Sequence, residues 1–186
     1  MAIQHSAITD PDIHEPKGVE SATLGQVYAA NGAGSGTWHI IDPRGSVIFS
    51  NIAAPLTTSY PSSYTKVAPT TTASGFPREV TEATTGRLTY TGTTTKPVRI
   101  TANLFISQAS GANRDIRIAI YKNGAIVASS EGQISTITAT KANLVTFADV
   151  LATQNDYFEI YIRNDGASGD VLTYNYFLGL SGLGIQ

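Results

Sequence analysis

The stretch KPVRITANLFIS, residues 96–107, alternates apolar and polar side chains along its length. Successive side chains of a β-strand point to opposite faces, so this pattern is typical of a strand that buries one face and exposes the other. The apolar face carries Val98, Ile100, Ala102, Leu104 and Ile106. We therefore predict a long β-strand here, with these side chains in a hydrophobic core.

Further stretches of the same kind predict an all-β chain. The segment RDIRIAIYKNGAIVAS, residues 114–129, predicts a β-hairpin, because Asn123–Gly124 fits a type I′ turn with positive φ at both central positions. No long stretch has helical periodicity. About eight strands at roughly ten-residue spacing favour an antiparallel two-sheet sandwich. The other clear strands are SVIFSN (46–51), RLTYTG (87–92), DYFEIYIRNDG (156–166) and DVLTYNYFLGLSG (170–182).

Composition narrows the class of protein. The chain has 186 residues, 41% of them hydrophobic, with 12 Lys and Arg against 14 Asp and Glu. No basic patch favours nucleic-acid binding. The absence of cysteine excludes disulfides and thiolate metal sites. No apolar run approaches the roughly 18 residues of a membrane helix, and the N-terminus lacks an apolar signal region. We expect a protein made and folded in the cytoplasm of the producing cell, with neither membrane nor nucleic acid as a partner.

The first part of the chain looks different from the rest. Residues 1–44 are predicted to be an extended, irregular segment, and residues 45–186 a sandwich domain that begins after the DPRG turn (42–45). The glycine-rich NGAGSGTW (31–38) ends in Trp38, the only tryptophan. A lone tryptophan after a glycine run is typical of an anchor that fills an apolar cleft. This segment is therefore a candidate strap for binding something larger.

Two resemblances follow from these residues. The succession GRLTYTG, VRITANLFIS, IRIAIYKNG, NDYFEIYIRN and YNYFLGLSG, between residues 86 and 182, resembles the trimeric jelly roll of the tumour necrosis factor (TNF) and C1q type, in the versions carried by virion proteins of tailed bacteriophages. Separately, ITDPDIHEPKGV (8–19) followed by GQVYAANGAGSGTW (25–38) resembles the N-terminal segment of phage head-fibre and capsid-decoration proteins. Residues 45–85 match least.

The resemblances imply a structural virion protein on the outer surface of a phage capsid. It would be a homotrimer whose N-terminal segment binds the major capsid protein. Prolines at 11 and 16 fix φ and bias the residues before them toward extended conformations, which suits a strap. The candidate capsid-docking residues are Ile8, Asp10, Pro11, Asp12, Ile13, His14, Glu15, Pro16, Lys17 and Trp38.

Two other interpretations of the strap stay open. Carboxylates and the imidazole at 10, 12, 14 and 15 are suitable ligands for a divalent metal. The two prolines spread them along an extended path, however, so we predict no metal site. The segment could also be a solvated tail. A loose calcium-loop spacing in NDGASGD (164–170) lacks the EF-hand pattern and favours a plain turn.

Three tyrosines are candidates for the trimer interface. In the jelly roll that the chain resembles, their strands lie in the sheet that faces the threefold axis. Tyrosine is amphipathic and common at interfaces. The alternative is that these rings fill the sandwich interior. We favour the interface for Tyr174 and Tyr176, predicted to share a face with Leu172 and Leu178, and leave Tyr90 undecided.

Catalysis finds little support in the sequence. There is no G-x-S-x-G elbow, and the glycine-rich NGAGSG is not followed by the lysine of a phosphate-binding loop. Asp149, Asp156 and Glu159 are interpreted as turn residues and solvated edge charges. We predict no enzyme, no catalytic residue and no cofactor. The main alternative function is a tail-fibre tip that binds host-surface glycans, followed by a depolymerase of such glycans.

Overall fold

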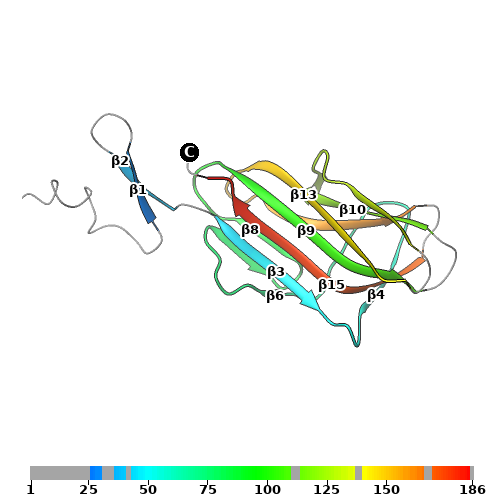
Figure 1. The fold of residues 1–186 in the computed structure, drawn as a ribbon. Coiled ribbons are helices and arrows are strands. Elements are labelled where there is room, and N and C mark those ends of the chain that lie inside the picture. The colour runs from blue at the N-terminus through cyan, green and yellow to red at the C-terminus, as the bar shows by residue number, and fades with distance from the viewer. Residues whose placement is uncertain are drawn as a thin grey trace, which may run out of the picture. The chain divides into compact units, whose positions relative to one another are not determined.

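A computed structural model describes residues 26–30, 36–40, 43–109, 114–136, 140–165 and 169–184 (Figure 1). Every regular element among them is a β-strand. No helix that could span a membrane is found among these residues. The described residues belong to two compact units, a short hairpin before residue 41 and a sandwich from Pro43 to Gly184. The predicted all-β two-sheet fold is confirmed.

The hairpin corrects the expectation that the first 44 residues are wholly irregular. Strands β1 (Gln26–Ala30) and β2 (Gly36–Ile40) pair in antiparallel register. Tyr28 lies opposite Trp38, and their ring centroids are 5.4 Å apart in an edge-to-face arrangement. Gly36, Thr37 and Trp38, at the end of the glycine-rich stretch, therefore lie within a strand. The predicted docking residues from Ile8 to Lys17 lie outside the described residues.

The first sheet of the sandwich has six strands, all antiparallel, in the order β13-β9-β15-β3-β6, with β4 also paired to β15. Figure 1 shows β13, β9, β15 and β3 side by side. Their bounds are β3 (Arg44–Ser50), β4 (Leu56–Tyr60), β6 (Thr72–Ala73), β9 (Lys96–Gln108), β13 (Ala142–Ala152) and β15 (Gly169–Gly182).

The second sheet has seven strands in the order β11-β10-β14-β8-β7, with β12 paired to β10 and β5 to β14. Asn123 and Gly124 have φ values of 53° and 80°, which confirms the predicted turn after β10. The bounds are β5 (Thr65–Lys66), β7 (Val80–Ala83), β8 (Arg87–Tyr90), β10 (Arg114–Lys122), β11 (Ala125–Ile126), β12 (Gly132–Thr136) and β14 (Tyr157–Asn164).

The core lies between the two sheets. The apolar face of β9 is completely buried from Val98 to Ile106, as its alternation predicted. Isoleucines of β10 and β14 cover it from the second sheet. The sandwich begins at Pro43, because the Gly182 N–H donates to the Pro43 carbonyl at 2.8 Å and Arg44 pairs with Ser181. Pro43 and Arg44 therefore belong to the sandwich and not to the segment before it.

A buried carboxylate joins two turns at one end of the second sheet. Asp156 accepts hydrogen bonds from the Thr153 N–H at 2.7 Å and the Asn123 side-chain amide at 2.6 Å, and pairs with Lys122 at 2.8 Å. Burial by itself would raise the pKa of Asp156, but these donors together lower it to about 2. Asp156 lies at a turn, as expected, but it is buried rather than solvated.

This carboxylate predicts a loss of stability in acid. The pKa of Asp156 in the folded protein lies below its ordinary value, so its contribution is complete above about pH 4 and is lost as pH falls toward 2. Asp156→Asn should lower the free energy of unfolding by roughly 2 kcal/mol at pH 7. Urea denaturation should show the difference shrinking between pH 4 and pH 2. An equal loss at both pH values would contradict this, and the exposed Asp170→Asn is the control.

Candidate functional site

The strongest candidate site is the outer face of the first sheet. On β13 the side chains alternate, so that Leu144 and Ala148 enter the core while Val145, Phe147 and Leu151 point outward. The outward three are 57%, 57% and 59% exposed. Large apolar side chains standing together on a sheet face indicate an interaction surface rather than ordinary surface composition.

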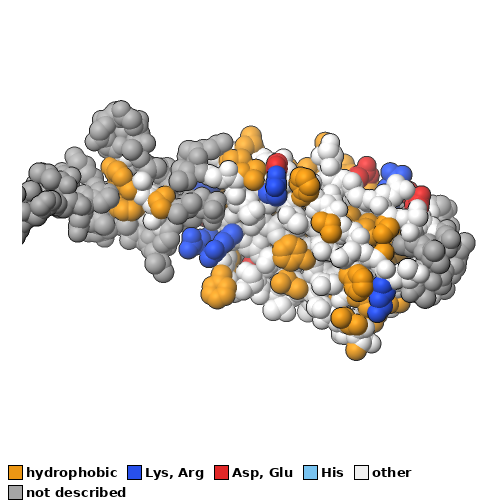
Figure 2. All heavy atoms as spheres, in the orientation of Figure 1, with side chains coloured by type: hydrophobic (Ala, Val, Ile, Leu, Met, Phe, Trp, Pro, Cys, Tyr) orange, Lys and Arg blue, Asp and Glu red, His pale blue; other side chains and the backbone are white. Residues whose placement is uncertain are grey.

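The apolar character continues across the neighbouring strands. Val145 lies opposite Asn103 on β9, which lies opposite Phe177 on β15, which lies opposite the exposed Ile48 on β3. Figure 2 shows hydrophobic side chains spread over this face. We call it the apolar face and define it by Ile48, Phe105, Val145, Phe147, Leu151 and Phe177.

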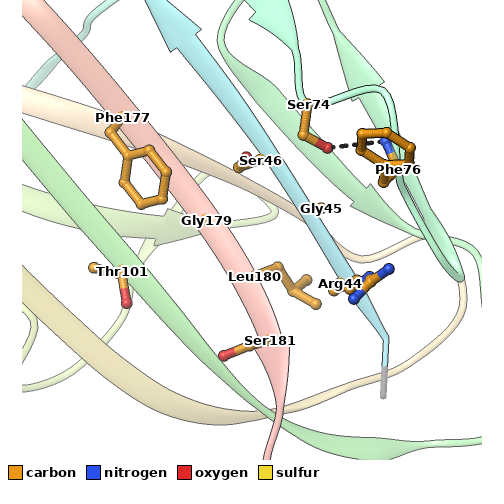
Figure 3. Close-up of a pocket in the computed structure, with 10 residues that line it drawn as sticks. All are labelled: Arg44, Gly45, Ser46, Ser74, Phe76, Thr101, Phe177, Gly179, Leu180 and Ser181. Atoms are coloured by element: carbon orange, nitrogen blue, oxygen red, sulfur yellow. Dashed lines mark hydrogen bonds between the residues drawn. The ribbon is translucent and has the colours of Figure 1, made fainter. Parts of the chain in front are cut away.

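An open pocket lies on the same face, near β3 (Figure 3). Its volume is about 370 Å³. Gly179 and Ser46 form its floor, while Phe177 stands on one side and Phe76 on the other. A Cβ at Gly179 would lie 2.8 Å from the Phe177 ring, so the glycine gives the ring its room. Phe76, in a turn before β7, is 76% exposed.

Charged residues border the apolar side chains. Arg99 on β9 donates two hydrogen bonds to Asp149 on β13, both 2.7 Å long. These bonds lower the pKa of Asp149. The guanidinium carbon of Arg99 also lies 4.9 Å from the ring centroid of Phe147. Arg44 lines one end of the pocket and is exposed, and no ion pair is found for it among the described residues.

Two of the three predicted interface tyrosines lie in the core. Tyr90 and Tyr176 are completely buried within one chain. The Tyr176 hydroxyl donates to the Gly86 carbonyl at 2.7 Å, and the Tyr90 hydroxyl to the Thr94 carbonyl at 2.7 Å. Burial raises the pKa of both rings. A side chain enclosed in this way has no surface left for a second subunit, so the structure corrects both assignments in favour of the interior alternative.

Tyr174 is placed differently from its neighbour. The register of β15 against β9 shifts between Thr173 and Asn175, which is a β-bulge that turns Tyr174 away from the core. Its hydroxyl is 3.1 Å from Ser107 Oγ, and its ring centroid is 5.7 Å from that of Phe105. It is 8% exposed at the margin of the apolar face. Its role at an interface stays a prediction.

The outer face of the second sheet carries tyrosines that the sequence analysis did not single out. Tyr121 and Tyr161 stack with ring centroids 3.8 Å apart, and Tyr64 lies 5.8 Å from Tyr121. Arg87 covers the ring of Tyr157 at 4.1 Å. We call Tyr64, Tyr121, Tyr157 and Tyr161 the tyrosine cluster. In the sequence, only the alternation along β14 pointed to this cluster. The ring contacts within it join residues that are distant in sequence.

The acidic residues considered for catalysis are held in ion pairs. Glu159, predicted to be a solvated edge charge, is only 2% exposed and contacts Lys66 Nζ at 2.5 Å and Arg87 Nε at 2.8 Å. Within the described ranges, no group of three or more His, Asp or Glu side chains could hold a metal ion.

The comparisons with known proteins establish the fold. No protein-family model matches the chain, and no curated protein sequence is significantly similar to it. Eiger TNF from S. frugiperda has a similar structure, with a TM-score of 0.51 and 14% identity over 77% of this chain and 95% of that one. The sandwich thus has the jelly-roll fold of this TNF structure.

Two other similar structures are more distant. PRD1 vertex protein P5 has a TM-score of 0.48 and 10% identity, covering 77% of this chain and 97% of its own. The globular domain of zebrafish complement 1qA has a TM-score of 0.45 and 11% identity, covering 74% and 94%.

Proposed function

We propose that this TNF/C1q-like jelly roll is a structural virion protein that decorates the outer surface of a bacteriophage capsid. It acts as a homotrimer that binds the major capsid protein through its N-terminal segment. The observation that carries the proposal is the division of the described chain into a sandwich with an exposed apolar face and a separate two-stranded hairpin with Trp38. One part suits self-association and the other suits attachment.

The apolar face supports the trimer. Val145, Phe147 and Leu151 are each more than half exposed in the isolated chain. Each large apolar side chain gains about 1.5–3 kcal/mol when it is fully buried, so covering several of them favours association. A sheet face of this kind meets a second copy without requiring any change in the core.

The hairpin supports attachment. A two-stranded sheet is marginally stable in water, and a surface that covers one of its faces would stabilise it. The Tyr28–Trp38 pair supplies an aromatic group for such a contact. The proposed capsid-docking residues include those from Ile8 to Lys17. They rest on the resemblance of this stretch to head-fibre and capsid-decoration proteins. Three arms on one trimer would bind far more tightly than one, through effective concentration.

The proposal is tested by two measurements on the full chain. Sedimentation at micromolar concentration should return a trimer. Capsids stripped of the protein and mixed with it should regain density on the outer shell in electron micrographs. A stable monomer would contradict the assembly, and binding at the tail alone would contradict the location.

The second candidate function, binding of host-surface glycans by a tail-fibre tip, rests on the tyrosine cluster. Its rings and the adjoining arginines give the outer face of the second sheet both apolar and hydrogen-bonding groups. Density at the tail, together with loss of host-polysaccharide binding in Tyr161→Ala, would favour this candidate over capsid decoration.

A further inference from the structure

We propose that the pocket at Gly179 receives Phe147 of a neighbouring copy of this chain. The inference rests on the proposed homotrimer and names the contact that holds it together. The pocket is open, has a volume of about 370 Å³, and is flanked by the rings of Phe177 and Phe76. Phe147 is the ring on β13 that stands outward, 57% exposed.

Cyclic symmetry requires two different surfaces on each copy. In a closed ring of three, one side of each subunit contacts the other side of the next subunit. The apolar face has this asymmetry, because β13 at one edge carries protruding side chains while the pocket lies over β15 and β3, with Thr101 of β9 at its border. The same chain therefore offers a projection and a hollow on opposite sides of one face.

The strand register places the two features at the same level. Phe147 pairs with Thr101, Thr101 with Gly179, and Gly179 with Ser46, so all four lie in one row across the sheet. We take the threefold axis of the proposed trimer to run roughly parallel to the strands, and rotation about such an axis leaves a residue at its own level. Phe147 of one copy therefore lies at the level of the row that contains Gly179 and Ser46 in the next copy. These two residues line the pocket.

The neighbouring row adds matching charge. Asp149 pairs with Arg99, Arg99 with Ser181, and Ser181 with Arg44. A copy whose Phe147 enters the pocket therefore brings Asp149 to the level of the neighbour's exposed Arg44. Asp149 already accepts from Arg99, and a carboxylate has lone pairs enough for a second guanidinium. The attraction between Asp149 of one copy and Arg44 of the next favours this arrangement of the two copies over arrangements that lack it.

Two variants of the full chain test the contact, one on each side. Phe147→Asp removes the projection, and Ser46→Phe fills the hollow with a side chain that points outward. Each should weaken trimer formation at least about 30-fold, measured by sedimentation equilibrium. Unchanged circular dichroism and a cooperative thermal unfolding transition in a monomer-forming variant would show that the sandwich still folds. Matched controls on the second sheet are Ile126→Asp and Gln133→Phe, both at exposed positions.

A mixture of the two variants tests whether the surfaces meet. The Ser46→Phe chain keeps its Phe147 and the Phe147→Asp chain keeps its pocket, so each mixed pair has one intact contact. The mixture should therefore show a higher average mass than either variant alone at the same total concentration.

The outcomes separate this inference from the proposed function. A monomeric wild type would refute the homotrimer itself. If the wild type is a trimer and Ser46→Phe also remains one, the pocket is not part of the interface and the inference is wrong. If both variants dissociate but the mixture gains no mass, Phe147 contacts something other than the pocket, such as its own symmetry copies at the axis.

Discussion

A chain that begins at Asp42 is expected to fold and form trimers but to lose all binding to capsids. The core cluster begins at Val47 and the first strand of the sandwich at Arg44, so we expect the sandwich to fold without the residues before Pro43. Deletion as far as residue 44 would instead remove the Pro43 carbonyl that accepts from Gly182 and the Arg44–Ser181 pair. Sedimentation of the truncated chain with stripped capsids measures the loss.

Point substitutions make this test sharper. Trp38→Ala should weaken attachment by roughly 2 kcal/mol per arm, because an aromatic ring buries 150–250 Å² and part of that area is already covered by Tyr28. Lys17→Ala removes at most an exposed ion pair, worth about 1 kcal/mol or less. Capsid binding that survives truncation would place the docking surface on the jelly roll. A truncated chain that fails to fold would show that the sandwich needs the earlier residues.

Tyr176→Ala is expected to cause the largest loss of stability of any substitution considered for this chain. The side chain is completely buried in the first sheet, and its hydroxyl reaches across to the Gly86 carbonyl at the turn between β7 and β8. Removing the ring leaves a cavity, so the free energy of unfolding should fall by about 3–5 kcal/mol. Urea denaturation at fixed protein concentration measures it.

Tyr176→Phe separates the contribution of the ring to stability from that of the hydroxyl. This variant keeps the packing and leaves the Gly86 carbonyl without its partner, which should cost about 1–3 kcal/mol. Both variants act within one protomer, so at concentrations where all the protein is folded the trimer should persist. Dissociation without loss of stability would restore Tyr176 as an interface residue and contradict the core placement.

The sequence predicted the regular part of the fold well. The alternation in residues 96–107 determined the buried face of β9, and the Asn123–Gly124 pair determined a turn, because both signals are local and have a single structural solution. The hairpin of β1 and β2 was not predicted, because the glycine-rich sequence between the two strands also suits a linker. The pairing of β1 with β2, in which Tyr28 lies opposite Trp38, distinguishes the two.

The candidate site was harder to predict. In DVLTYNYFLGLSG the period of two puts Tyr174 and Tyr176 on one face, but the bulge between Thr173 and Asn175 adds a residue and sends them to opposite faces. No local pattern marks such a shift. The pocket at Gly179 depends on side chains from separate strands and a turn, and Glu159 is buried by Lys66 and Arg87 from other strands. Such neighbourhoods exist only after the sheets have formed.

The position of β15 in its sheet has a consequence for how the chain folds during synthesis. Of the described sandwich strands β15 is made last and β3 first, and β15 lies between β9 and β3 in the sheet. Until β15 emerges, β3 lacks its main partner and the apolar inner side of β9 stays open at one edge. Pairing the two ends closes a long loop, and such contacts form slowly. Folding of this sheet therefore waits until β15 has been made, and subunits join only once that strand is in place.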